Sequence, residues 1–233
     1  MHIFEDVERD IRRVYERWAD RSADYFERSR TEYEHYVRPA ASFAERVTRQ
    51  EMELINLTYT EWFLFEYELK DGLTPLECFV ATPPLSAPAS CVSRLRQVAE
   101  TQRFLRCAIL EKSPEAGDVL LEDLGSGEAY LVQAPVVARR DSWRDGSLAI
   151  RIARVGGSWL HVGKTMLYDR APPALVTPGP GEPDGDAVVI AKTDEGWGFV
   201  HRERSSSYFL NFLRDVIGID GAYSESFRVV GGA

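Results

Sequence analysis

The chain has 233 residues, of which 44% are hydrophobic and 11% aromatic, and it carries a formal net charge of −9 at pH 7. This composition excludes a disordered chain, and the length is enough for one large domain or two small ones with a real core. A net negative charge argues against a dedicated nucleic-acid binder, whose surface should be basic.

The sequence predicts a cytoplasmic protein. Its three cysteines, Cys78, Cys91 and Cys107, are too few and too widely spaced for a disulfide framework. The first residues are charged rather than apolar, so we expect no signal peptide. The most apolar stretch is interrupted by polar residues, whereas a membrane span needs about 20 consecutive apolar residues, so we expect no contact with a membrane.

Helical periodicity dominates residues 1–102, which carry a net charge of −6 and are expected to form a helical domain. Apolar side chains recur at three- and four-residue spacing through residues 3–37. A phase shift near Asp20–Asp24 indicates either two helices or one bent helix. Pro39 should end this part, and a further helix should run from Pro39 or Ala40 into the central stretch.

The central stretch, residues 51–80, is the most apolar long segment of the chain. Its first part predicts a helix that is apolar almost all round and is buried on several sides. Gly72 suits the left-handed conformation that ends a helix. Thr74 is a good N-cap for a second, short helix, with Pro75 at the first helical position and Glu77 completing a capping box.

Two carboxylates on the apolar helix, Glu61 and Glu66, have two interpretations. As buried acid/base groups they would point to catalysis, but five residues separate them and they do not share a face cleanly. The alternative places them at the edge of the buried stripe, where they reach water or a neighbouring arginine. We favour the second, because buried unpaired carboxylates are rare in proteins.

After an amphipathic helix expected over Ser90–Gln102, the pattern changes to the two-residue period of strands. Short turns rich in Gly join these strands and predict antiparallel pairing. Residues 103–170, with a net charge of +1, should therefore close into a small antiparallel β-barrel, SH3-like or OB-like, or form a strongly bent sheet. The five expected strands are Phe104–Glu111, Asp118–Leu124, Glu128–Gln133, Ser147–Val155 and Ser158–Val162.

Residues 171–233 make up the third expected segment, with a net charge of −4. It begins with an extended linker rich in Pro and Gly, Ala171–Gly185. An amphipathic helix that ends at Gly218 should dock on the rest, and the tail beyond Asp220 should be loose. Two strands are expected before that helix, Asp186–Lys192 and Gly196–Val200. The predicted fold class is α+β, with an N-terminal helical bundle packed on the small barrel and a C-terminal helix.

The segment Val119–Ala129 resembles the first motif of methyltransferases that use S-adenosylmethionine, in which an apolar strand and an acid precede Gly-x-Gly. That motif requires a helix N-terminus after the glycines, because the backbone there approaches the ligand. Strand-like residues follow Gly127 instead, and Ala129 replaces the third glycine. A hairpin that turns at Gly125–Gly127 explains the same residues with fewer assumptions.

The sequence predicts no metal site and no cofactor. Glu32 and His35 have the spacing found in di-iron helical bundles, but no second Glu-x-x-His follows. A structural zinc site needs clustered cysteines and histidines, and none of the histidines is close in sequence to a cysteine. The four histidines are His2, His35, His161 and His201.

One basic and aromatic cluster is expected around the longest connection between strands, Val136–Gly146. Side chains that point outward from the strands Ser147–Val155 and Ser158–Val162 should complete it. Such a cluster could bind an acidic peptide or a single-stranded nucleic acid. The alternative, which we favour, is that Trp159 packs under the helices while the arginines pair with the acidic helical half. The candidate binding residues are Arg139, Arg140, Trp143, Arg144, Arg151, Trp159 and His161.

The run Trp62–Tyr67, the following Asp71–Leu76, and a strand-rich region with Asp118, Leu124 and Gly127 resemble a group of uncharacterised bacterial proteins related to SEC-C motif-containing proteins. The likeness covers roughly residues 50–165. Members often carry a zinc-binding tail, but this chain has no matching cluster of cysteines and histidines at its C-terminus. The metal-dependent adapter role that the tail implies is therefore not carried over, and the group implies no established activity.

The sequence favours a non-enzymatic interaction or adapter protein, because no catalytic constellation survives scrutiny. Its partner is expected to be another protein, docked on the helical half or on the barrel edge. Two alternatives stay open: an S-adenosylmethionine-dependent methyltransferase that acts through Asp123–Gly127, and a weak binder of single-stranded nucleic acid that uses the basic and aromatic cluster. The oligomeric state is not defined.

Overall fold

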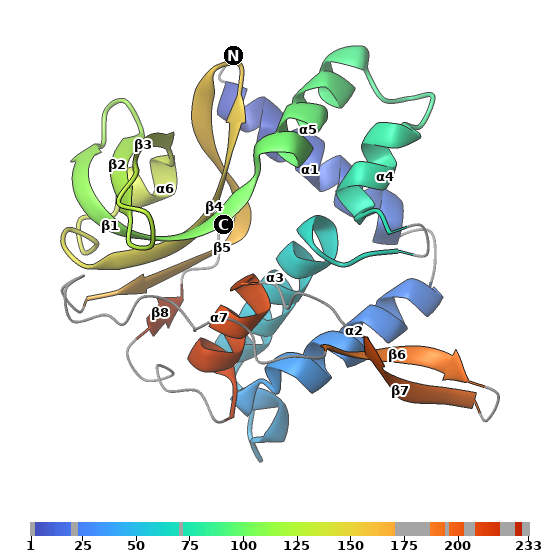
Figure 1. Ribbon diagram of the computed structural model, residues 1–233. Helices are drawn as coiled ribbons and strands as arrows, with labels where there is room; N and C mark the ends of the chain where they lie inside the picture. The colour runs from blue at the N-terminus through green and yellow to red at the C-terminus, as the bar shows by residue number, and fades with distance from the viewer. Residues whose placement is uncertain are drawn as a thin grey trace.

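A computed structural model describes residues 3–19, 23–69, 72–170, 187–193, 196–202, 208–219 and 227–229. These residues form an α+β protein in which helices gather beside and below a strongly curved sheet (Figure 1). No helix within the described ranges is long and apolar enough to cross a membrane. The helices are α1 (Ile3–Ala19), α2 (Ala23–Val37), the 3-10 helix η1 (Ala40–Phe43), α3 (Arg49–Phe65), α4 (Pro75–Ala81), α5 (Ala89–Thr101), α6 (Pro135–Ala138) and α7 (Tyr208–Ile217).

The central helix α3 is shorter at both ends than the sequence indicates. It begins at Arg49 behind a complete capping box, in which the Thr48 side chain accepts from the N–H of Glu51 and the Glu51 side chain accepts from the N–H of Thr48. The prediction of one helix running from Pro39 or Ala40 into the central stretch is therefore wrong. A local cap of this kind outcompetes helical continuation, because it satisfies N–H groups at a new helix start.

The C-terminal end of α3 lies at Phe65 rather than near Gly72. The N–H of Tyr67 reaches back to the carbonyl of Trp62, and the Tyr67 ring packs 5.1 Å from Trp62 and 5.7 Å from Phe63, between ring centroids. This aromatic packing turns the chain away from the helix axis before the glycine. Gly72 does adopt the expected left-handed conformation, with φ of 73°, but in the loop beyond the helix.

The second helix start of this region is confirmed. The Thr74 side chain accepts a hydrogen bond from the N–H of Glu77, the Glu77 side chain accepts from the N–H of Thr74, and Pro75 occupies the first helical turn. Leu76 and Phe79 on α4 are buried against the helical core. The cap therefore fixes where α4 begins and which of its faces meets the core.

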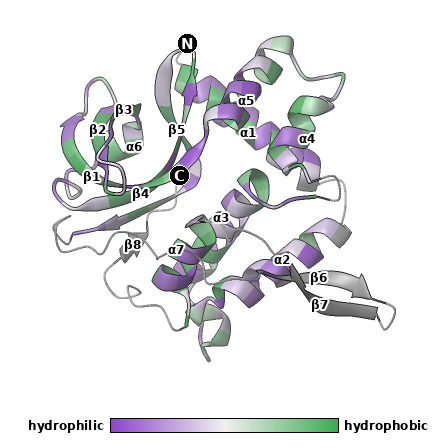
Figure 2. Ribbon diagram, viewed as in Figure 1, coloured by the Kyte–Doolittle hydropathy of each residue, from purple (hydrophilic) through white to green (hydrophobic). Residues whose placement is uncertain are grey.

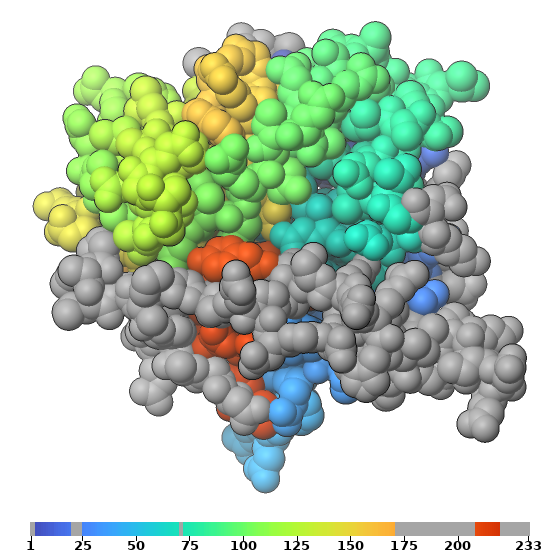
Figure 3. Space-filling view, in the orientation of Figure 1, coloured from blue at the N-terminus to red at the C-terminus, as the bar shows by residue number. Residues whose placement is uncertain are grey.

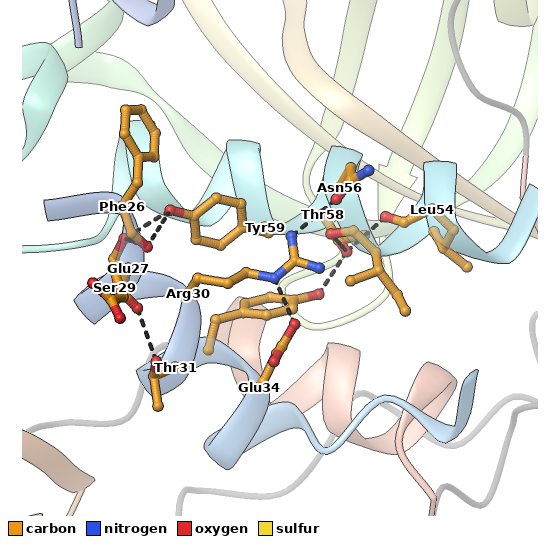
Figure 4. Close-up of polar contacts among 12 residues, drawn as sticks. Phe26, Glu27, Ser29, Arg30, Thr31, Glu34, Leu54, Asn56, Thr58 and Tyr59 are labelled. Atoms are coloured by element: carbon orange, nitrogen blue, oxygen red, sulfur yellow. Dashed lines mark hydrogen bonds and ion pairs between the residues drawn. The ribbon is translucent and has the colours of Figure 1, made fainter. Parts of the chain in front are cut away.

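Hydroxyl groups join α2 to α3 through hydrogen bonds within an aromatic core (Figure 4). The Tyr59 hydroxyl lies 2.7 Å from the Ser29 Oγ, and the Tyr33 hydroxyl lies 2.6 Å from the Thr58 Oγ1. The Arg30 guanidinium lies 5.1 Å from the centre of the Tyr59 ring. Burial raises the pKa of Tyr59 to about 12 and raises that of Tyr33 further, so both phenols stay protonated and act as hydrogen-bonding core residues.

The five strands expected between residues 103 and 170 are all present, and the last extends to Asp169. β1 pairs antiparallel with β2 and β4, β2 with β3, and β4 with β5. β3 also pairs with β5, in parallel, at Val132–Trp159 and Gln133–Leu160. The pairings thus follow a closed circuit, β1-β2-β3-β5-β4. The strands are β1 (Arg103–Ser113), β2 (Asp118–Asp123), β3 (Ala129–Gln133), β4 (Ser147–Val155) and β5 (Ser158–Asp169).

The curved sheet has two apolar faces, and each belongs to a different core. Its inner face encloses one cluster that includes Val119, Leu121, Val132 and Ile150, which α6 also covers. The outer faces of β4 and β5 pack against the helices, where Leu160 joins the same cluster as α1, α3 and α7. Figure 2 shows hydrophobic residues on α3, on α7 and along the strands. The sheet is therefore buried on both sides along β4 and β5.

The C-terminal segment contains the two expected strands, which pair antiparallel as β6 (Ala187–Thr193) and β7 (Gly196–Arg202). Helix α7 buries Phe209 and Phe212 in the helical core, as its amphipathic pattern indicates. The prediction of a loose tail beyond Asp220 is wrong for Phe227–Val229, which forms β8 and pairs with the end of β5. The expected linker Ala171–Gly185 lies outside the described residues.

Candidate functional site

The predicted basic and aromatic cluster is divided among three places in the structure. The connection between β3 and β4 carries Arg139, Arg140 and Arg144, and it begins with the short helix α6. Arg139 and Arg144 are exposed, and the Arg144 Nε donates to the carbonyl of Asp141 at 3.0 Å. Arg139 and Arg144 therefore remain at the surface, whereas the partly buried Arg140 contacts the Trp143 ring.

Trp143 is not available for ligand stacking, because its side chain is buried in the inner core of the sheet. Its ring stacks on Tyr168 with 5.0 Å between centroids, and the Arg140 guanidinium lies 5.0 Å from the Trp143 ring centre. The Lys112 ammonium donates to the carbonyls of Arg140 and Trp143, at 2.6 and 3.0 Å. These contacts anchor the connection to β1 and β5.

Arg151 points away from the inner core, as expected, but it is not exposed beside Trp159 and His161, which lie on the other face of the sheet. It pairs with the acidic helical half, as the favoured alternative predicts. Its side chain is 2% exposed. The Arg151 Nε donates to Glu61 at 2.9 Å, and the other two nitrogens of the guanidinium donate to Glu66 and Gln102. Burial alone would lower the pKa of Arg151, but Glu66 and Glu61 outweigh this effect and raise it. The two carboxylates of α3 thus reach a neighbouring arginine, as the favoured interpretation had it.

The Arg151 ion cluster joins the helices to the sheet at several points. Besides Arg151, the Glu61 carboxylate accepts from the backbone N–H groups of Lys164 and Thr165 on β5, at 2.8 and 2.7 Å. A Cβ atom at Gly163 would lie 2.6 Å from the Glu61 Oε2, so only glycine leaves room for the carboxylate. Both oxygens of the Glu61 carboxylate accept hydrogen bonds from groups of the protein. The carboxylate therefore links α3 to β4 and β5 and is not available as a reactive group.

Trp159 and His161 lie on β5 and turn toward the inner core. The Trp159 ring meets Tyr130 edge to face at 5.2 Å, and the Arg103 guanidinium lies 5.2 Å from its centre. His161 pairs with Ile152, a residue of the inner core, and its buried Nε2 has no hydrogen-bond partner in the described part of the chain. Trp159 therefore packs within the sheet and not under the helices. Burial, with a smaller contribution from Lys164, lowers the pKa of His161 to about 4.

The glycine turn at Gly125–Gly127 joins two antiparallel strands, and the hairpin prediction is confirmed. Asp123 holds the turn through bonds from the N–H groups of Gly125 and Ser126, at 3.3 and 3.1 Å. Gly127 adopts φ of 72°, which favours glycine. The helix N-terminus that a methyltransferase motif requires does not follow this turn.

The outward face of β1, β2 and β3 carries a row of leucines that the sequence reading overlooked. The register places Glu111 opposite Leu120, and Leu120 opposite Leu131. Leu110 occupies a bulge of β1 beside this row and is 51% exposed, while Leu131 is 61% exposed. Bulges redirect side chains, and this one adds a third leucine to the row. We call Leu110, Leu120 and Leu131 the leucine row.

Carboxylates surround the leucine row. Glu111 lies within it, and Asp118 and Glu122 lie two residues to either side of Leu120 on the same face of β2. None of these three carboxylates pairs with a cation among the residues that the structure describes. Strands β1 and β2 lie at the molecular surface in the space-filling view (Figure 3). The face therefore combines exposed apolar side chains with unpaired negative charge.

No protein-family model, curated protein or solved structure matches this chain. The resemblance to SEC-C motif-containing proteins accordingly stays a prediction.

Proposed function

We propose that this chain is a non-enzymatic interaction protein that docks a partner protein on the leucine row. The observation that carries the proposal is the alignment of Leu110, Leu120 and Leu131 across three neighbouring strands, two of them more than half exposed. Facing residues on paired strands have Cβ atoms about 5 Å apart, so the row spans about 10 Å. Contiguous exposed apolar patches with a polar rim are characteristic of docking surfaces.

The connectivity of the sheet supports the same face. We propose that the circuit β1-β2-β3-β5-β4 is an OB-type barrel, because its single parallel pair joins β3 to β5 and a helix lies between β3 and β4. OB barrels bind their ligands on the face of strands 2 and 3 and with the adjoining loops. The leucine row lies on the corresponding strands of this chain.

The structural roles of the acidic residues that the sequence suggested for catalysis argue against an enzyme. The buried carboxylate of Glu61 and the partly buried carboxylate of Glu66 both pair with Arg151. The remaining sequence candidate for catalysis, Asp123–Gly127, is a hairpin turn whose aspartate bonds its own loop. Among the described residues, neither of these sequence candidates leaves a free acid or base for a reaction, which favours binding over catalysis.

A photo-crosslinking amino acid at position 131 tests the proposal in the cells that express the chain. Leu85 is the matched control, because it is a fully exposed leucine in the loop between α4 and α5. We expect position 131 to give discrete protein adducts that position 85 does not give, and Leu120→Glu in the same chain should abolish them. Identical adduct patterns at the two positions, or no adduct at position 131, would refute docking on the leucine row.

A further inference from the structure

We infer that the leucine row receives a basic amphipathic segment of another protein, one in which apolar side chains are flanked by Lys or Arg. This inference rests on the proposed docking function and adds the chemistry of the partner. It follows from charge on the β2–β3 hairpin and from the positions of the three carboxylates around Leu120.

The hairpin is uniformly negative. Residues 113–134 contain five Asp or Glu and no Lys, Arg or His. The nearest cations on β1 are turned away from this face, since Lys112 bonds carbonyls of the β3–β4 connection and the Arg106 side chain is 2% exposed. Arg103 on β1 pairs with Glu128, 3.8 Å away, but no ion pair of the described residues includes Glu111, Asp118 or Glu122. A ligand on the leucine row therefore meets three carboxylates without a paired cation, and positive charge on the ligand is favoured.

The spacing of the carboxylates defines the pattern of the partner. Residues two apart on a strand are separated by about 6.5 to 7 Å, so Asp118 and Glu122 lie at about that distance on either side of Leu120. On a helix, positions four apart are separated by about 6 Å along one face. A helix that rests an apolar residue on the leucine row would bring cations at its i−4 and i+4 positions close to these two carboxylates.

Two other occupants fit less well. A single-stranded nucleic acid would place phosphates against Glu111, Asp118 and Glu122, which is repulsive. A second copy that used the same face would oppose these carboxylates to themselves. A second copy could also offer its helical half to the leucine row. The longest exposed run there, residues 42–53, holds two arginines and three glutamates and so has no net positive charge.

The probe is a fluorescently labelled 15-residue amphipathic helix of Leu and Lys, with a Leu and Glu peptide of the same pattern for comparison. We expect the full chain to bind the Lys peptide in an anisotropy titration, to bind it less tightly as salt rises, and to ignore the Glu peptide. The double variant Asp118→Asn and Glu122→Gln should bind the Lys peptide about tenfold more weakly, a few-fold for each lost charge pair.

The matched control is Glu5→Gln with Glu8→Gln, on the exposed face of α1, which changes the net charge from −9 to −7 just as the test variant does. The control should bind like the parent chain. Equal loss in both variants, or equal binding of the two peptides, would overturn the inference. So would displacement of the Lys peptide by single-stranded DNA, or dimerisation of the chain that Leu131→Ser abolishes.

The crosslinking experiment separates this inference from the docking proposal. Adducts at position 131 with no binding of the Lys peptide would overturn the partner chemistry and leave docking in place. Absence of adducts at position 131 would overturn docking itself, and the partner chemistry with it.

Discussion

Replacing Glu61 by alanine should lower the free energy of unfolding by about 4 kcal/mol. The carboxylate is fully buried and accepts from the Arg151 Nε at 2.9 Å and from the N–H groups of Lys164 and Thr165 at 2.8 and 2.7 Å. Breaking a buried ion pair from one side costs about 3–5 kcal/mol, and a buried N–H left without an acceptor costs about 1–3 kcal/mol. Water that enters the vacated space offsets part of the sum.

Urea denaturation, followed by tryptophan fluorescence and by circular dichroism, measures this loss. Glu61→Gln should lose less than Glu61→Ala, because the amide oxygen still accepts from the two N–H groups. The control is Glu53→Ala on the same helix, where the Glu53 side chain is 54% exposed and pairs with Arg49, so that its loss should stay below 1 kcal/mol. If Glu61→Ala also loses less than 1 kcal/mol, the ion cluster does not join the helices to the sheet.

Three further changes test other parts of the structure. His161→Gln should make stability less sensitive to acid, because burial lowers the pKa of His161 to about 4 from about 6.5 in the unfolded chain. The free energy of unfolding of the parent should therefore fall by about 3 kcal/mol between pH 6.5 and pH 4, and the same pH dependence in the variant would contradict this. Gly163→Ala should lower the urea midpoint, because the new methyl group displaces the Glu61 carboxylate. An unchanged midpoint would show that the Glu61 side chain has room to move. Thr74→Ala should lose about 1 kcal/mol with the cap of α4, seen as a lower melting temperature, and no shift would mean that core packing alone places α4.

The strands and turns could be predicted from sequence because their signals are local. The Gly125–Gly127 turn needs only the left-handed conformation at Gly127 and the side chain of Asp123 to reverse the chain. Likewise, the cap at Thr74 depends on residues within three positions. Each of these features is determined by neighbours in the chain, and neighbours are what a sequence displays directly.

The deep burial of Arg151 could not be predicted in the same way, because it depends on residues far along the chain. Alternation within β4 tells only that Arg151 faces away from the inner core. That outer face is covered by α3 and α7, whose Phe65 and Phe209 rings each lie 5.0 Å from the guanidinium. A side chain on the outer face of the sheet is thus one of the most deeply buried groups of the protein, because the helices cover that face.

The sequences of β2 and β3 contain a local sign of the leucine row, which is an apolar residue at an outward position of each strand. In β2 the inward positions are Val119 and Leu121, so Leu120 occupies a position where an exposed strand normally carries a polar residue. Leu131 occupies the equivalent position of β3, between the inward Tyr130 and Val132. Apolar residues in the polar phase of two consecutive strands indicate either a second buried face or a docking surface. The exposed fractions favour the second.

Charge summed over a domain concealed the property that distinguishes this face. Residues 103–170 are nearly neutral as a whole, yet residues 113–134 hold five acids and no base, and the balancing arginines lie elsewhere. Of these, Arg151 is buried against α3, and Arg139 and Arg144 lie in the β3–β4 connection. Electrostatic forces between exposed groups fade over roughly 10 Å at moderate salt, so a ligand responds to the charges of the face it touches and not to the sum. The net charge of −9 and the near-neutral middle segment both argued against nucleic acid, but the stronger reason is local, because the three carboxylates beside the leucine row, which have no ion pair among the described residues, would repel phosphate and favour a basic polypeptide.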